Sequence, residues 1–238
     1  DFLYKELLCF ACNPHVAPIT ACREVEELKD KCQWGDRIKE YHGGDLIQLK
    51  KALMKPTRRF IFIGHADAEG SDGSMRLGLT KPGGDLVEPP PPADVAAILA
   101  VRSKAFGGIL ECCFFNGCCS EELGRMTREE ADMECVVCWR TRNLDSVARP
   151  FSAKFFQQVA AGRSYEEAFR LAVQNTAKNA YVSVGGMKLK VTIGEPPDGP
   201  PVPPYKAGVP VLLLRGATGA CRDLVATADG SVIEEPAP

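Results

Sequence analysis

The chain has 238 residues, of which 45% are hydrophobic, so it is long enough to bury one sizeable core and too short for two large ones. Its 29 basic and 31 acidic residues give a formal net charge of −2 with no long run of one sign, and this balance predicts neither a nucleic-acid nor a membrane partner. No apolar stretch approaches the roughly 20 residues that cross a bilayer, and the first residues lack the regions of a signal peptide. We therefore expect one soluble α/β domain.

The first five expected elements alternate between strand and helix, which predicts a mainly parallel sheet with helices on both faces. Apolar runs predict strands from Leu7 to Ala11, Arg37 to Tyr41, Phe60 to Ile63, within Gly107 to Phe115 around Ile109 and Leu110, Cys135 to Trp139, and Val209 to Leu214. Helical spacing and capping residues predict helices from Ala21 to Cys32, Asp45 through Leu53, Asp145 to Ala161, and Ser164, in a capping box, to about Lys178.

Four segments fall outside this alternation. The polar stretch from Ala66 to Pro92 holds a short hairpin-like piece, MRLGLT, and loops of this length are usually functional or disordered. A hairpin is expected from Tyr181 to Ile193, followed by the Pro-rich run EPPDGPPVPPY as a semi-rigid connector. We expect the domain to occupy residues 1–218 and residues 219–238 to form a weakly ordered extension, apart from a strand near Leu224.

The eleven cysteines indicate a reducing environment. Their number is odd, and the adjacent pairs Cys112-Cys113 and Cys118-Cys119 are poorly suited to a regular disulfide framework. Reduced thiols in the cytoplasm are the simpler expectation. Because the sequence begins at Asp1 without an initiator Met, we also expect a processed piece or an excised domain of a longer protein.

Two reactive side chains follow neighbouring predicted strands. Sites in parallel α/β sheets form at the carboxyl ends of strands, where His65 follows the third strand and Cys113 lies near the end of the fourth. If these strands are adjacent, an imidazole and a thiol meet, as nucleophilic catalysis requires. The alternative is that Cys113 is a small buried hydrophobe and that His65 only donates to a loop carbonyl.

At these residues the sequence resembles the cysteine peptidases of clan CD, which include caspases, metacaspases, separase and the CHAT group. The stretch FIFIGHADAEG followed by ILECCFFNG is similar to their strand ending in His-Gly and their strand ending in Ala-Cys or Cys-Cys. Three further stretches resemble CHAT landmarks and occur in the family's order, so that the resemblance runs from Leu7 to Gln174. They are LLCFACNP, the glutamate-bearing CREVEELKD, and VVCWRTRNLDSVARPFSAKFFQQVAAGRSYEEAF. The resemblance implies a caspase-like three-layer sandwich and a cysteine endopeptidase with His65 and Cys113 as its catalytic pair.

The chain departs from the family pattern next to both residues. Ala66 stands where the family has Gly, and its N–H is expected to form the oxyanion hole with that of Cys113. Phe114-Phe115 replaces the small polar pair that usually follows the nucleophile. A one-residue shift of the strand would make Cys112 the nucleophile, while Cys118 and Cys119 are assigned to the following helix.

Two acidic residues are candidates for substrate binding. Glu111 lies two residues before Cys113, on the same face of a strand, and relatives with an acid there cut after Arg or Lys. Asp145, after the fifth strand, is a second candidate. The alternative for Glu111 is an internal ion pair with Arg140 or Arg142.

Metal or cofactor binding is not expected. Cys9 and Cys12, like Cys135 and Cys138, have zinc-like spacing, but strand residues three apart face opposite ways, so core cysteines are the better interpretation. The acidic loop near the proposed site is a candidate for Ca²⁺ binding, as in some metacaspases, but EF-hand spacing is absent and we interpret the loop as solvated. Its acids are Asp67, Glu69, Asp72 and Asp85.

The sequence thus predicts a cysteine endopeptidase with a peptide or protein substrate that cleaves after a basic residue. One rival is a catalytically inactive CHAT-like interaction module, which Ala66 and Phe114-Phe115 favour. A nucleotide- or small-molecule-binding domain is the other, but the chain has no Gly-rich phosphate loop. CHAT domains generally sit in larger proteins, which implies regulatory modules or a partner chain.

Overall fold

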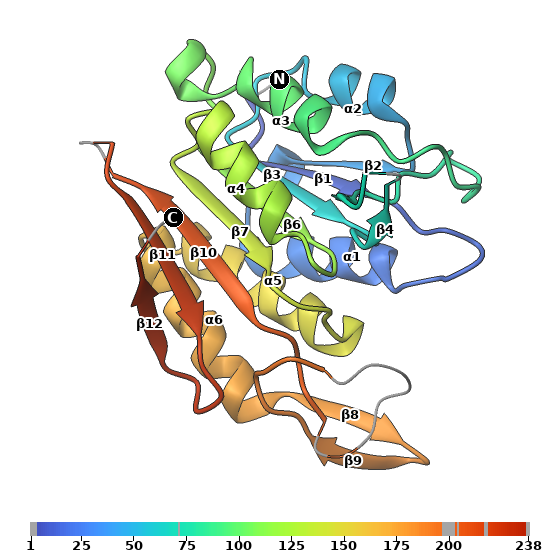
Figure 1. The fold of residues 1–238 in the computed structure, drawn as a ribbon, viewed down its shortest axis with the longest axis vertical. Helices are drawn as coiled ribbons and strands as arrows, with labels where there is room; N and C mark the ends of the chain where they lie inside the picture. The colour runs from blue at the N-terminus through green and yellow to red at the C-terminus, as the bar shows by residue number, and fades with distance from the viewer. Residues whose placement is uncertain (1–3, 71, 197–202, 204, 217–218, 237–238) are drawn as a thin grey trace.

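The computed structural model describes residues 4–70, 72–196, 203, 205–216 and 219–236. Its centre is an eight-stranded sheet in the order β12-β11-β10-β7-β6-β3-β1-β2 (Figure 1). The strands are β1 (Leu7–Ala11), β2 (Ile38–His42), β3 (Arg59–Ile63), β6 (Cys112–Asn116), β7 (Cys135–Trp139), β10 (Pro210–Arg215), β11 (Cys221–Ala226) and β12 (Val232–Glu235). From β2 to β7 neighbouring strands are parallel, and from β7 to β12 they are antiparallel.

Helices cover both faces of the sheet because strand side chains alternate between two separate cores. In β6, Phe114 packs in one core, while Cys113 and Phe115 pack in the other. The first core is closed by α1 (Ala21–Cys32), α5 (Asp145–Ala160) and α6 (Tyr165–Asn179). The second is closed by α2 (Leu46–Ala52), α3 (Pro92–Ala100) and α4 (Glu121–Glu130). This three-layer α/β arrangement confirms the predicted fold class.

Several local predictions are also confirmed. The bounds of β1, α1 and β7 are those that the sequence pattern gives. Capping boxes begin α2 at Asp45 and α6 at Ser164. The expected hairpin is formed by β8 (Tyr181–Val184) and β9 (Met187–Lys190), which project from the main body (Figure 1).

Short elements fill the segments between the layers. They are η1 (Gly35–Arg37), β4 (Ala68–Glu69), β5 (Met75–Arg76) and η2 (Lys104–Phe106). The four prolines lead directly into α3, with Pro92 as its first residue, where a proline is favourable because no N–H is needed there. Most of the Pro-rich run expected as a connector lies outside the described residues. Within the described ranges, no helix combines the length and the apolar character that crossing a membrane requires.

The C-terminal segment corrects the predicted domain boundary at residue 218. Residues 221–226 and 232–235 form β11 and β12, which extend the central sheet beyond β10. Leu224 and Asp223 are fully buried, and Asp223 forms ion pairs with Arg125 (2.5 Å) and Arg128 of α4. The strand expected near Leu224 is confirmed as β11. The rest of the segment was expected to be weakly ordered but also contains β12, and together the two strands cover the edge that β10 would otherwise expose.

Candidate active site

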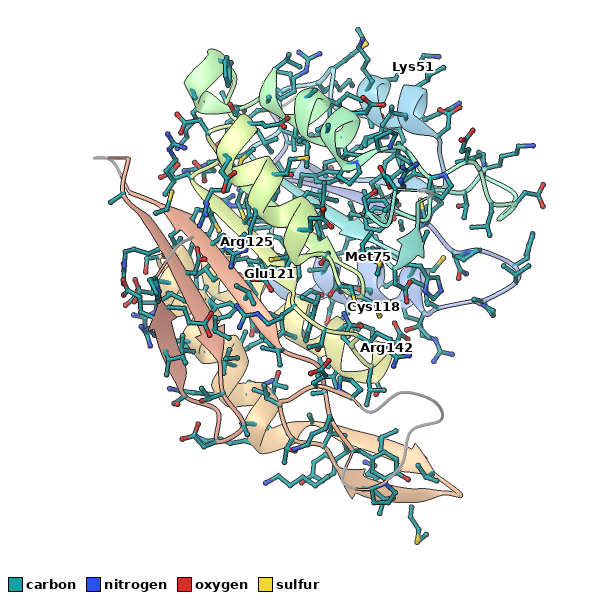
Figure 2. All side chains as sticks on the ribbon, viewed as in Figure 1. Lys51, Met75, Cys118, Glu121, Arg125 and Arg142 are labelled. Atoms are coloured by element: carbon teal, nitrogen blue, oxygen red, sulfur yellow. The ribbon has the colours of Figure 1, made fainter. Side chains whose placement is uncertain are left out.

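The register of β3 and β6 determines which residues meet at the carboxyl edge of the sheet. Ile63 pairs with Asn116, so His65 and Cys118, each two residues further on, both leave the sheet at this edge. They line one cavity of about 120 Å³. Figure 2 shows Cys118 on the loop between β6 and α4. The cavity is also lined by Ile19, Glu24, Ile63, Gly64, Asn116, Gly117, Asn143, Asp145 and Ala148.

Cys113 is not at this edge, which contradicts its predicted pairing with His65. It pairs with Phe60, five residues before His65, and a rise of about 3.3 Å per residue puts it roughly 16 Å back along the strand. Its side chain has no exposed surface, and burial raises the pKa of its thiol well above the usual value. The alternative, Cys112, is one residue further from the edge and equally buried, with its Sγ 3.5 Å from that of Cys135.

The turn that carries Cys118 is shaped by close packing against the segment of His65. A Cβ on Gly117 would lie 2.7 Å from the Cβ of Ala66, so only glycine fits at this position. Ser120 donates from Oγ to the carbonyl of Phe115 (2.9 Å) and accepts from the N–H of Trp139 (3.1 Å), which ties the turn to β6 and β7. Cys118 and Cys119 therefore precede α4 instead of belonging to it, which corrects their predicted assignment.

The thiol of Cys118 is partly enclosed and receives a backbone hydrogen bond. The N–H of Asn143 donates to its Sγ over 3.4 Å. Burial raises the pKa of this thiol to about 11, although the hydrogen bond from Asn143 acts in the opposite direction. The thiol is thus protonated at neutral pH, and forming the thiolate requires a base.

His65 lies on the same cavity with one nitrogen fixed by the main chain. Its Nε2 donates to the carbonyl of Ala17 over 2.8 Å, so in the neutral ring Nδ1 carries the free lone pair. The Oδ1 atom of Asp67 lies 3.8 Å from Nδ1. The imidazole is therefore oriented, and Nδ1 is available as a base.

Two backbone N–H groups lie in the segments that carry His65 and Cys118 and have no hydrogen-bond acceptor among the described residues. Within the described residues, neither the amide of Ala66 nor that of Cys118 donates a hydrogen bond to another group. The second predicted oxyanion donor, the N–H of Cys113, lies inside β6, away from the cavity. Of the two predicted oxyanion donors, Ala66 therefore remains a candidate, and Cys118 replaces Cys113 as the second candidate.

Glu24 of α1 is a buried acid on the cavity that sequence reasoning did not single out. Its Oε1 accepts from the side-chain amide of Asn116 (2.7 Å) and from the hydroxyl of Ser152. The Oδ1 of Asn116 in turn accepts from Nε1 of Trp139 (2.8 Å). This chain of bonds fixes the last residue of β6, directly before Gly117. The only sequence signal was the glutamate in the CHAT-like first helix.

Burial raises the pKa of Glu24 from 4.5 to about 7, so this group makes stability depend on pH. A raised pKa in the folded state gives stability that is complete below pH 4.5 and is lost as the pH rises through 7. We expect Glu24→Gln, which keeps an acceptor for Asn116 and Ser152, to remove this loss and to be more stable than the unmodified chain at pH 8 by about 1–3 kcal/mol. Urea unfolding of both proteins at pH 5 and pH 8 measures the difference. A difference that is the same at both pH values would contradict the prediction.

Asp145 is the predicted substrate-binding acid that the structure places on the cavity. It is the first residue of α5, and its Oδ2 accepts from Oγ1 (2.5 Å) and from the N–H (3.4 Å) of Thr20. An acid in the first turn of a helix is stabilised by the helix dipole. The bonds from Thr20 thus hold the carboxyl group of Asp145 at the cavity wall.

Glu111 lies at the opposite end of the sheet, which contradicts its predicted role in substrate binding. It directly precedes β6 and is 4% exposed. Its carboxylate contacts Lys104 (2.6 Å), Arg58 (2.8 Å), Arg59 (3.1 Å) and the hydroxyl of Tyr165 (2.6 Å). Burial opposes its charge, but the bonds from Lys104 and Tyr165 outweigh burial and hold the pKa of Glu111 below its usual value.

The alternative of an internal ion pair for Glu111 is therefore correct, although the predicted partners are not. Arg140 instead pairs with Glu121 and Glu235. Its bonds join the start of α4 to β12, at the edge of the sheet furthest from β2.

The structure shows where the cysteines with zinc-like spacing and the acidic loop lie. Cys9 and Cys135 pack in one core, and Cys12 and Cys138 in the other, so neither pair converges on one site. In the acidic loop, Asp72 accepts from Ser74 and pairs with Arg76. Among the residues that the structure describes, no three His, Cys, Asp or Glu side chains are grouped so as to hold a metal ion.

Nine chains of solved structures match this fold. One of them is a secreted C11 cysteine protease from Bacteroides thetaiotaomicron in complex with an irreversible peptide inhibitor, with a TM-score of 0.52 and 10% sequence identity. The match covers 89% of this chain and 66% of that chain, slightly less than two thirds of it. No protein-family model matches the sequence, and no curated protein matches it either. The fold is therefore caspase-like, as the resemblance implied.

Proposed function

We propose that this chain is a cysteine endopeptidase with a dyad of His65 and Cys118. The observation that carries the proposal is the shared cavity at the carboxyl ends of β3 and β6. It is lined by an imidazole and a thiol that each follow one of these two adjacent parallel strands. The likeness in fold to a cysteine protease supports it.

In the proposed reaction, Nδ1 of His65 takes the proton of the Cys118 thiol as the sulfur attacks the peptide carbonyl. The carbonyl oxygen becomes negative and accepts from the N–H groups of Ala66 and Cys118. The imidazolium then gives its proton to the leaving amine, and the C–N bond breaks to leave a thioester. Water, deprotonated by Nδ1, hydrolyses the thioester and restores the thiol. Throughout, the bond from Nε2 to Ala17 keeps the ring oriented.

The charge around the cavity supports cleavage after Arg or Lys, with Asp145 as the recognition acid. Asp145 and Glu24 line the cavity, and Asp67 lies beside His65. At about 120 Å³ the cavity is smaller than the roughly 300–1,000 Å³ of small-molecule sites and has room for one side chain. A cationic side chain entering it would pair with the carboxylate of Asp145.

A peptide-library cleavage assay tests this proposal. We expect the unmodified chain to cut after Arg and Lys, and Asp145→Asn to lower kcat/KM for these substrates by about a hundredfold, since one charge-assisted contact is worth roughly 2–3 kcal/mol. Asparagine still accepts from Thr20, so the start of α5 is retained. Glu195→Gln is the matched control, because it removes an acid outside the cavity lining. Cleavage after basic residues that persists unchanged in Asp145→Asn would exclude this acid from recognition.

The second candidate is an inactive interaction module, which the raised pKa of the Cys118 thiol favours. An inactive module has no need of a reactive thiol at the cavity, so Cys118 would alkylate at the same slow rate with or without His65. Regulatory modules of a longer protein or a partner chain are proposed for either candidate. A reducing compartment remains a proposal as well, which the unpaired state of all eleven cysteines supports.

A further inference from the structure

A second, larger cavity of about 360 Å³ lies at the end of β1 and β2, apart from His65 and Cys118. Its walls come from the loop after β1, the first turn of α1, the end of β2, and the loop at residues 80–84. The cavity is lined by Cys22, His42, His15 and Lys81, together with prolines and glycines. Its size falls within the range of small-molecule sites.

Cys22 and His42, which line this cavity, form a relay with Glu40 behind them. The exposed thiol of Cys22 lies 3.9 Å from Nδ1 of His42, and Nε2 of His42 lies 3.2 Å from Oε2 of Glu40. Lys29 donates to the other oxygen of Glu40 over 2.6 Å. This series of contacts therefore runs from the exposed sulfur of Cys22 through the imidazole of His42 to the ion pair of Glu40 and Lys29.

The arrangement follows from the way α1 packs on β2. Glu40 and His42 are two residues apart on a strand and share the face that α1 covers. Cys22 and Lys29 are seven residues apart on a helix and share one side of α1, so one meets His42 while the other meets Glu40.

These contacts favour one tautomer of the neutral ring. Nε2 must carry the proton to donate to the carboxylate, which leaves Nδ1 with a lone pair toward the thiol. The hydrogen bond from Lys29 holds the pKa of Glu40 below its usual value, so its carboxylate remains an acceptor at neutral pH. This is the order of groups that activates a cysteine nucleophile.

We propose that Cys22 is a reactive thiol that forms a mixed disulfide with a small, carboxylate-bearing disulfide bound in this cavity. Nδ1 of His42 takes the thiol proton, and the sulfur of Cys22 attacks one sulfur of the ligand. A new S–S bond forms as the S–S bond of the ligand breaks, and the departing thiolate takes the proton from His42. Lys81, on the cavity wall, attracts the carboxylates of the ligand.

Cys221 is a control thiol within the same chain. It is partly exposed, and its Sγ contacts the carbonyl of Gly219 at 3.9 Å, without a histidine. A thiol that reacts only because it is accessible would resemble Cys221, whereas an activated one would depend on His42. The other interpretation of Glu40, His42 and Lys29 is a solvated polar rim at an edge strand, and such a rim has no effect on the reactivity of a sulfur atom.

The experiment uses the full chain with Cys118→Ala, so that the thiol of the proposed dyad does not react. This chain is incubated at neutral pH with glutathione disulfide, and peptide mass mapping follows the mixed disulfides at Cys22 and Cys221. We expect Cys22 to react at least about tenfold faster than Cys221, and His42→Gln to lower the rate of Cys22 by about tenfold while that of Cys221 stays the same. Equal rates at the two cysteines, or no effect of His42→Gln, would overturn the proposal.

Two further arms examine the relay and the ligand charge. Glu40→Gln is expected to lower the rate of Cys22 severalfold, because the imidazole loses its negatively charged partner. Lys81→Met is expected to slow glutathione disulfide but not the uncharged hydroxyethyl disulfide. If Lys81→Met changes the rate of neither disulfide relative to the unmodified chain, the cavity does not select carboxylates and that part of the proposal is wrong. The measurements need no peptidase activity, so they stand apart from the proposed function.

Discussion

Cys118→Ala is expected to abolish peptide hydrolysis, with kcat/KM falling by about a thousandfold or more, because no other thiol lines the cavity with His65. Cys113→Ala is the matched variant, since it removes an identical group from the neighbouring stretch of chain. It is expected to retain cleavage, because Cys113 is buried in β6. Its cost is about 1–2 kcal/mol of folding free energy from the small cavity that it leaves.

Thiol labelling separates the two cysteines without a substrate. Iodoacetamide is expected to modify Cys118 in a manner that depends on His65, so His65→Ala should slow the labelling of this residue alone. Cys113 should label only after unfolding. A chain that loses cleavage with Cys113→Ala and keeps it with Cys118→Ala would restore the pairing that the sequence pattern predicts.

Glu111→Ala is expected to lower the free energy of unfolding by about 3–5 kcal/mol, because it leaves buried charge without its partner. Arg59 is only 6% exposed and directs one nitrogen to Glu111. Urea unfolding measures the loss. Glu134→Ala is the control: Glu134 also pairs with Lys104 but is half exposed, so its removal should cost less than about 1 kcal/mol. Equal costs for the two variants would contradict a structural role for Glu111.

This result changes how specificity has to be tested. A variant of Glu111 that loses activity would do so through the fold, because its carboxylate is at the end of β6 opposite Cys118. Asp145→Asn is the informative substitution, because it removes charge at the cavity and keeps the bonds to Thr20.

The layer arrangement was predictable because periodicity reports burial. Five apolar residues in a row, as in β1, indicate a strand covered on both faces, and the capping boxes identify helix starts from local chemistry alone. After β10, the sequence predicted only a strand near Leu224, and the antiparallel pairing of β11 and β12 with the central sheet was not predictable in this way. Arg222 and Asp223 interrupt the apolar pattern of β11, and only the ion pairs of Asp223 with α4 make its burial favourable.

The proposed nucleophile, Cys118, was missed because the end of a strand depends on tertiary pairing. The apolar stretch begins at Ile109, so local hydrophobicity centres the strand there, whereas pairing with β3 and β7 shifts it to Cys112–Asn116. The turn signal Asn116-Gly117, directly before Cys118, marked the true end. His65 and Asp145 were easier to place, because the strands before them end where their apolar runs end.

The group that orients His65 is a peptide carbonyl, at Ala17. Any amino acid at this position supplies the same carbonyl oxygen, so relatives with this geometry can have different residues here. Comparing their side chains would therefore not reveal the group that orients the histidine. Substitution at residue 17 should likewise leave catalysis nearly unchanged. Only a change in the path of the main chain, for instance after substitution of the nearby Pro14 or Pro18, can move the carbonyl oxygen of Ala17 away from His65.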